Sequence, residues 1–266
     1  MRADVANPER GADVAQTLIK GLAVLEVFTP EAPLLGNSEI ALRIGLTRPT
    51  TARLTRTLAT LGYLSYDASR AKYRLGARGL TLANPLLANI GVHRVARPLM
   101  QECATRIGAN ISMGLISGVD SVYIECVRTG DPEIFSTEIG ARLPLSRSAI
   151  GFALLSMLKP DALTAKLASL THQRQDARAA VKAALAHVGK TGFAVSRGDW
   201  AEHFHGAAAP VMREPVTGID LAINCGAPTF RLRPQQLEKE IGPTLVALAG
   251  SIRALWAQHP DAQRKR

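Results

Sequence analysis

The stretch GLTRPTTARLTRTLATLGYL, residues 45–64, contains three arginines and no acidic residue. Thr47 is a suitable N-cap for a helix that starts here, and proline is tolerated in a first turn, where Pro49 stands. Leu54, Leu58 and Leu61 repeat at helical spacing and predict the buried face of that helix. An exposed helix normally pairs its arginines with glutamates four residues away. These arginines lack such partners, so we expect their negative charge to come from another molecule.

The residues on either side of this helix predict a small helical domain with a hairpin. Residues 16–29 place Leu18, Leu22, Leu25 and Phe28 on one helical stripe that ends before Pro30. A short second helix starts at residue 37 or 38 and leads into the quoted stretch. YLSYD and KYRLG, separated by a polar turn at residues 67–71, predict a β-hairpin. Three helices followed by a hairpin predict a winged helix–turn–helix.

The positive charge of the chain is concentrated in this region. The chain has 266 residues and a formal net charge of +10, with a pI of about 10.0. Between residues 38 and 78, eight basic residues oppose two acidic ones, so +6 lies in about a sixth of the chain. A solvated helix face is the plainer alternative, but the helix spacing, the missing acids and the basic hairpin together favour major-groove binding. The predicted contacts with double-stranded operator DNA are Arg43, Arg48, Thr50, Thr51, Arg53, Arg56, Arg70 and Lys72.

Several function classes lack support in the sequence. No apolar run approaches the roughly 20 residues that span a bilayer, and the N-terminus lacks the apolar segment of a secretory signal, so we expect a cytoplasmic protein. Three widely spaced cysteines, at 103, 126 and 225, predict free thiols in a reducing compartment. No CxxC pair, P-loop or GxGxxG occurs, and we expect no catalytic residue and no cofactor. His203 and His205 are candidate metal ligands, but two histidines are common by chance, and we expect no metal site.

The remainder of the chain predicts an α+β domain, because helices and strands mix without a regular βαβ repeat. We expect a flexible arm at 1–14, the winged domain at 15–77, a connecting helix at 78–92, the α+β domain at 93–258 and a basic tail at 259–266. The connecting helix is expected to kink or end near Pro85. Expected strands are 110–117, 122–128, 133–140, 193–198, 203–213 and 218–226, with a loop at 141–145. Expected helices are 93–108, 146–158, 160–170, 176–192 and 234–258, the last interrupted at Gly242–Pro243.

Along nearly its full length the chain resembles an IclR-type transcriptional regulator. The stretches that carry the resemblance are QTLIKGLAVLEVF (16–28), LTRPTTARLTRTLATLGYL (46–64), KYRLG (72–76), GARLPLSRSAIGFALLSML (140–158), FAVSRGDWAEHFHGAAAPV (193–211) and GIDLAINCGAP (218–228). The resemblance implies a dimeric or tetrameric regulator, with a winged domain on the operator and a GAF-like domain that binds a small metabolite. It puts Arg48, Thr50 and Arg53 at the DNA. In the effector pocket it puts the backbone of Gly140 and Ala141, together with Asp199, Ile223 and Cys225.

The chain departs from the family pattern inside that pocket. Ile223 and Cys225 stand where hydroxyl side chains are frequent, Ser146 replaces a frequent His, and Phe152 replaces a frequent Lys or Arg. A standard family ligand is therefore not assumed.

The residues themselves favour a small organic acid as the effector. Ser146 and Ser148 open an apolar helix whose free N–H groups attract anions, although both serines are equally suited to capping alone. Alternation along the strands turns Ser112, and Tyr123 or Glu125, toward one cavity, and Asn110 is either a pocket or a turn residue. The leading hypothesis is a ligand-responsive regulator. The alternatives are an architectural DNA-binding protein whose second domain only oligomerises, and a hydrolase with an incidental basic domain.

Overall fold

The computed structural model describes residues 14–129, 138–171 and 176–259. The chain forms two compact units, Met1–Leu86 and Leu87–Arg266. Each unit has its own hydrophobic core, and each is described by itself. Among the described residues, no helix is long and apolar enough to cross a membrane.

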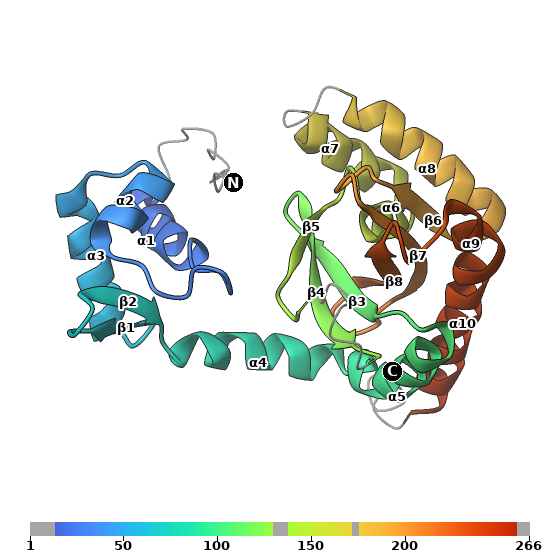
Figure 1. The fold of residues 1–266 in the computed structure, drawn as a ribbon, viewed down its shortest axis with the longest axis horizontal. Coiled ribbons are helices and arrows are strands. Elements are labelled where there is room, and N and C mark those ends of the chain that lie inside the picture. Colours follow the sequence, from blue (N-terminus) through green and yellow to red (C-terminus); the bar gives the residue numbers. More distant parts are fainter. Residues whose placement is uncertain (1–13, 130–137, 172–175, 260–266) are drawn as a thin grey trace. The chain divides into compact units, whose positions relative to one another are not determined.

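The N-terminal unit is the predicted winged helix–turn–helix (Figure 1). Its helices are α1 (Gln16–Glu26), α2 (Asn37–Ile44) and α3 (Arg48–Thr60), and its wing consists of β1 (Leu64–Asp67) and β2 (Lys72–Leu75). Gly45 makes the turn between α2 and α3 with a φ of 67°, a left-handed conformation that glycine adopts at little cost. The core of the unit contains Val24, Val27, Phe28, Leu35, Ile40, Leu54 and Leu64. The three helices pack around these residues, which leaves one face of α3 in solvent.

The first helix buries a narrower face than its sequence predicted. Leu18 and Leu22 are 63% and 52% exposed, and Leu61 of the predicted α3 stripe is 46% exposed. The expectation that these three leucines face the core is wrong. The apolar residues of α1 are spread over more than one side of the helix, and the side with Val24 is the one that packs. The exposed leucines leave an apolar surface on α1.

The connecting helix α4 (Arg78–Ile90) does not end at Pro85, which lies inside it. The chain breaks at Gly91 instead, where φ is 57°, and α5 (Val92–Ile107) begins directly afterwards. A side chain at position 91 would come within 2.9 Å of the Trp256 ring, so the turn requires glycine for space as well as for conformation.

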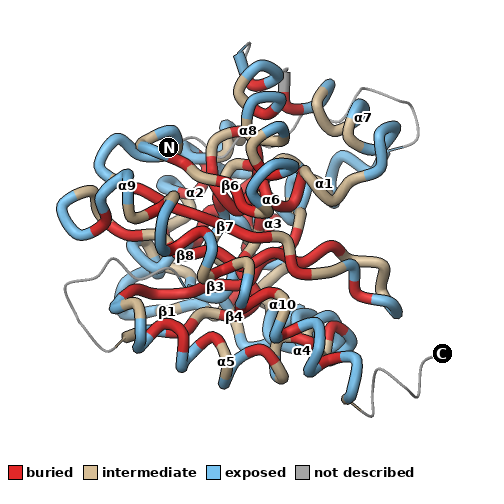
Figure 2. The backbone as a smooth tube through the Cα atoms, turned by 90° about the vertical axis from the view of Figure 1, so that its right-hand side faces the viewer, coloured by how far each residue is buried: buried red, intermediate tan, exposed pale blue. Residues whose placement is uncertain are grey.

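The C-terminal unit is an α+β domain built on an antiparallel sheet, which confirms the expected class (Figure 1). In the described residues the sheet has the order β5-β4-β3-β8-β7-β6. The strands are β3 (Ile111–Ser117), β4 (Asp120–Val127), β5 (Arg142–Pro144), β6 (Ala194–Arg197), β7 (Phe204–Arg213) and β8 (Asp220–Pro228). Helices α5 and α10 (Gly242–Gln258) cover one face; α6 (Ala149–Leu155), α7 (Pro160–Thr171) and α8 (Ala177–Thr191) lie on the other. The strands between them are largely buried (Figure 2).

Three segments differ from their sequence-based expectation. The expected loop at 141–145 contains the edge strand β5, in which Leu143 pairs with Ser121 of β4. The expected strand at 133–140 lies mostly outside the described residues, and its last residues form a turn. The C-terminal helix changes character just before Gly242: a short α9 (Pro234–Gln236) is followed by a π-helical turn at Leu237–Ile241, and only then by α10.

Candidate DNA interface and effector cavity

The start of α3 is fixed by its own threonines. The backbone N–H of Thr50 donates to Thr47 Oγ1 at 3.5 Å, and the Thr47 hydroxyl donates to Thr50 Oγ1 at 2.9 Å. Thr47 is thus the N-cap that the sequence predicted, and Pro49 lies in the first turn. This cap holds the leading end of the helix, where Arg48 stands, in one conformation.

Three arginines of α3 keep their charges available. Arg48, Arg53 and Arg56 are exposed, and none of them forms an ion pair within the described part of the chain. They lie on the side of the helix opposite to Leu54, which is buried in the core. A DNA phosphate or a guanine edge supplies the missing acceptor without breaking any contact inside the domain.

The other predicted basic contacts already have partners. Arg43 Nη1 donates to the Val27 carbonyl at 3.1 Å, and so joins α2 to the end of α1. In the wing, Arg70 pairs with Asp67 at 3.4 Å, and Lys72 pairs with Glu39 of α2 at 3.0 Å. These pairs are at the surface, where an ion pair adds little to the stability of the fold. A DNA phosphate can therefore replace the carboxylate as the partner of each basic side chain.

Two threonines of α3 face inward. Thr51, predicted as a DNA contact, is fully buried, and its hydroxyl donates to the Thr47 carbonyl at 3.1 Å. Thr55 is also fully buried, and its hydroxyl donates to Asn37 Oδ1 of α2 at 2.8 Å. The structure therefore does not place Thr51 on the exposed face. A threonine whose hydroxyl donates to a carbonyl of its own helix can pack inside the fold like a small apolar residue.

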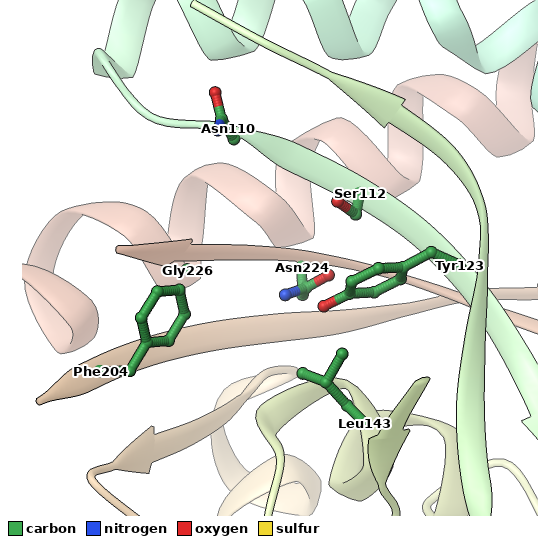
Figure 3. Close-up of a pocket in the computed structure, with 7 residues that line it drawn as sticks. All are labelled: Asn110, Ser112, Tyr123, Leu143, Phe204, Asn224 and Gly226. Atoms are coloured by element: carbon green, nitrogen blue, oxygen red, sulfur yellow. The ribbon is translucent and has the colours of Figure 1, made fainter. Parts of the chain in front are cut away.

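In the C-terminal unit, polar side chains from several strands meet around a cavity of about 10 Å³ (Figure 3). Its lining residues are Asn110, Ser112, Tyr123, Leu143, Phe204, Asn224 and Gly226. Three of them, Asn110, Ser112 and Tyr123, are predicted effector contacts. The cavity has room for about one water molecule, so a larger ligand requires its walls to move apart.

Sheet register explains why these side chains meet. Ser112 pairs with Cys126 on one side and with Asn224 on the other, so the three residues form a row on one face of the sheet. The Ser112 hydroxyl donates to Cys126 Sγ at 3.4 Å, and Asn110 Oδ1 accepts the backbone N–H of Thr129 at 3.1 Å. The cavity therefore presents neutral hydrogen-bonding groups, and no charged residue lines it.

The centre of the cavity is the pair Tyr123 and Asn224. Burial raises the pKa of the Tyr123 phenol well above its usual range, and a hydrogen bond from Asn224 opposes the rise only in part. The phenol therefore stays protonated at neutral pH and can donate. Asn224 is 7% exposed, and its Oδ1 has no hydrogen-bond partner within the described structure. A buried acceptor without a donor costs free energy unless a bound molecule satisfies it.

Comparison with known proteins identifies the two units. The helix–turn–helix domain of IclR matches residues 17–68, and the C-terminal domain of the bacterial transcriptional regulator IclR matches residues 85–254. The chain belongs to the IclR family of transcriptional regulators.

Individual IclR relatives align over most of their length. The regulator TsaQ1/TsaQ2 of Comamonas testosteroni is 28% identical over 92% of this chain and 90% of its own. An IclR regulator from Brucella abortus of known structure is 34% identical, with a TM-score of 0.76 over 92% of this chain and 94% of its own. An IclR homologue of Microbacterium hydrocarbonoxydans, complexed with 4-hydroxybenzoate, shares the fold at 22% identity, with a TM-score of 0.69 over 90% of this chain and 98% of its own. The relatives are transcriptional regulators rather than enzymes.

The IclR resemblance put Ile223 and Cys225 of β8 in the pocket, and the structure places both side chains on the other face of the sheet. Ile223 and Cys225 pair with Met113 and Ile111, and their side chains belong to the core under α5 and α10. Burial, and to a smaller extent Cys103, raises the pKa of the Cys225 thiol to about 12. The structure therefore brings neither residue to the cavity, and the residue between them, Asn224, faces it instead.

A β-bulge between β3 and β4 turns Glu125 away from the cavity. The register shifts between Met113 and Gly114, so that Tyr123 opposes Gly114 while Glu125 opposes Met113. Strict alternation would put Tyr123 and Glu125 on one face, but the bulge adds a residue between them. Glu125 consequently faces α5, where its carboxylate is buried and pairs with Arg97.

The remaining predicted pocket residues are not among those that line the cavity. Gly140 and Ala141 contact the Tyr123 backbone: Gly140 N–H donates to the Tyr123 carbonyl at 2.8 Å, and Tyr123 N–H donates to Ala141 at 3.0 Å. Asp199 is exposed and accepts the backbone N–H of Arg197 at 2.9 Å. Ser146 and Ser148 are buried; the Ser148 hydroxyl caps α6 by accepting from Gly151 at 3.1 Å, while donating to Pro144 at 2.7 Å.

Four lining residues were absent from the sequence prediction: Leu143, Phe204, Asn224 and Gly226. Asn224 carries a readable signal, because it is a polar residue between the apolar Ile223 and Cys225 on an alternating strand. Gly226 makes room for Phe204, whose ring lies 2.6 Å from the place a side chain at 226 would occupy. That relation depends on the three-dimensional structure and has no signal in the sequence.

Other candidate sites have weaker geometry. A hollow of about 360 Å³ between α6, α7 and α8 has mainly apolar walls, and none of its lining side chains has an unsatisfied buried atom in the described structure. His205 is buried with Nδ1 2.7 Å from the Leu232 carbonyl, whereas His203 precedes β7 and is exposed. The described residues contain no group of three metal-ligating side chains. The three cysteines are free thiols.

Proposed function

We propose that this IclR-family regulator binds an operator through α3 and the wing, and that a small organic acid bound in the C-terminal cavity alters that binding. The observation that carries the first half is the exposed row of Arg48, Arg53 and Arg56, which have no acidic partners in the described chain. Thr50 stands beside them at the capped end of the helix. Arg70 and Lys72 extend the same basic surface into the wing.

The second half rests on the chemistry of the cavity. The Tyr123 phenol and the amide groups of Asn110 and Asn224 supply neutral hydrogen-bond donors, which together accommodate a carboxylate without a fixed cation. The 4-hydroxybenzoate complex of the Microbacterium homologue supports the proposal, because it shows that this fold can hold an organic acid. The ligand would act by binding two arrangements of the protein with unequal affinity.

We further propose that the protein works in the cytoplasm as a homodimer or homotetramer. Its DNA lies there, and a dimer places two recognition helices in successive major grooves about 34–36 Å apart. Leu18 and Leu22 on α1, and Leu80, Leu82 and Leu86 on α4, are exposed leucines that a second copy would cover.

The test is fluorescence anisotropy of the full-length protein on DNA from upstream of its own gene. A scrambled duplex is the control, and two salt concentrations separate phosphate contacts from base contacts. A regulator should prefer its operator by about 10³ or more. Equal binding to both duplexes calls for genome-wide selection of binding sites, and the absence of any preferred sequence there would support an architectural role.

Arg53→Ala tests the recognition helix directly. We expect operator affinity to fall by about tenfold or more, because the variant removes a phosphate or base contact. The matched control is Arg178→Ala, which removes an exposed arginine from α8 of the other unit and should leave affinity unchanged. Equal effects of the two substitutions would mean that only net charge matters, which contradicts the proposal.

A further inference from the structure

One atom of the effector cavity constrains the ligand more than any other. Asn224 Oδ1 is a buried acceptor without a donor in the described structure, and it belongs to a side chain that lines the cavity. The same side chain is fixed from two sides, by its place on β8 between β3 and β7 and by its hydrogen bond with Tyr123. With the amide N–H bonded to the Tyr123 oxygen, Oδ1 is the atom left to meet a ligand.

A carboxylate is the wrong group to place against this atom. Ionised carboxylates only accept hydrogen bonds, so a carboxylate at Asn224 Oδ1 would set acceptor against acceptor. None of the residues that line the cavity is charged, so no cation there offsets that repulsion. The part of the ligand that meets Asn224 Oδ1 must therefore be a group that donates a hydrogen bond.

We infer that the effector carries a hydroxyl group, separate from its carboxylate, that donates to Asn224 Oδ1. This inference rests on the proposed organic-acid function and narrows it to hydroxylated acids. The carboxylate then binds the donors that remain, among them the Tyr123 phenol, which is 1% exposed and stays protonated. Leu143 and Phe204 supply the apolar walls that contact the carbon skeleton.

Binding is selective because a ligand that lacks the hydroxyl and a ligand whose hydroxyl is methylated should both bind more weakly. A ligand without the hydroxyl leaves the acceptor buried and unsatisfied, and a methoxy group in its place offers no donor and adds bulk. Since an unsatisfied buried group is costly, we expect each change to weaken binding by about 10- to 100-fold.

The experiment compares matched acids on the full-length protein by calorimetry. The probes are glycolate, acetate and methoxyacetate, and, at larger size, 4-hydroxybenzoate, benzoate and 4-methoxybenzoate. In the unaltered protein the hydroxylated member of at least one set should bind about 10- to 100-fold more tightly than the other two. In Asn224→Leu, which keeps the volume and removes the acceptor, that ratio should fall to about one.

A second variant protects the result against misfolding. Asn224→Asp keeps an acceptor oxygen at the same place, and the charge it adds affects all three acids of a set alike, so the hydroxyl preference should persist. Equal affinities within both sets, no binding by either hydroxylated acid, or an unchanged ratio in Asn224→Leu would each overturn the inference. An unchanged ratio in Asn224→Leu would mean that Asn224 Oδ1 binds only a water molecule.

The same probes separate this inference from the proposed function. Operator affinity is measured by anisotropy with each acid at saturation. If acetate or benzoate shifts it as strongly as the hydroxylated acid, the hydroxyl requirement fails while organic-acid sensing stands. If none of the six acids shifts it, organic-acid sensing fails with the inference.

Discussion

At the scale of single residues, Thr55 holds two helices of the DNA-binding unit together. Its hydroxyl, fully buried, donates to Asn37 Oδ1 at 2.8 Å and so links α3 to the first turn of α2. Thr55→Val keeps the shape and leaves the Asn37 oxygen without this donor, so we expect a loss of about 1–2 kcal/mol in the free energy of unfolding. Urea unfolding of the full-length protein measures it. Thr57→Val, on the exposed side of α3, should change stability by less than about 0.5 kcal/mol and is the control.

Single residues also show where sequence reasoning stops. The exposed arginines of α3 were predictable, because leucine spacing defines the opposite face. Thr51 and Thr55 were not, since a threonine carries no signal that separates an exposed hydroxyl from one satisfied inside the fold. In the cavity, Ser112 and Tyr123 followed from alternation, but Glu125 did not, because the bulge at Met113 shifts the register by one residue. Asn224 was within reach of the same alternation argument applied to β8.

At the scale of elements, the junction of the π-helical turn and α10 packs against Phe193 at a glycine. A side chain at Gly242 would come within 2.3 Å of the Phe193 ring, which is itself buried. We expect Gly242→Ala to lower stability by about 1–3 kcal/mol, because the ring or the helix must shift. Gly250→Ala in the same helix meets its nearest atom at 3.8 Å and should be neutral or stabilising, by up to about 1 kcal/mol.

Thermal melting of both glycine variants checks that comparison. Adding Phe193→Leu to Gly242→Ala should recover part of the lost stability, because the smaller side chain leaves room for the methyl group added at position 242. Equal melting temperatures for the two alanine variants would show that the contact relaxes freely.

Strong periodicity made the long elements of this fold predictable. The elements of the winged domain and the strands β3 and β7 fall within their expected ranges, and α5, β4 and β8 overlap theirs but begin or end one or two residues outside them. The edge strand β5 is only three residues long, and its pairing with β4 is a long-range contact without a local pattern. Pro85 inside α4 is the converse case, in which the helix continues past a residue that usually ends one.

At the scale of the whole molecule, the exposed leucines of α4 predict how copies assemble. Leu80 and Leu82 are 74% and 63% exposed, and apolar side chains of this size in solvent favour a protein partner. A glutamate in such an interface must lose its hydration, so we expect Leu80→Glu to weaken dimerisation by at least about tenfold. Operator affinity should fall with it, because each monomer then reads a half-site alone.

Leu42 on α2 supplies the matched control for assembly. It is 86% exposed, so Leu42→Glu introduces the same charge on another helix of the same unit. Sedimentation velocity over a range of protein concentrations should show an unchanged dimer for Leu42→Glu and a shift toward monomer for Leu80→Glu. If both variants dissociate alike, added charge alone disrupts the assembly. If neither does, the copies meet elsewhere, and the α4 leucines have another partner.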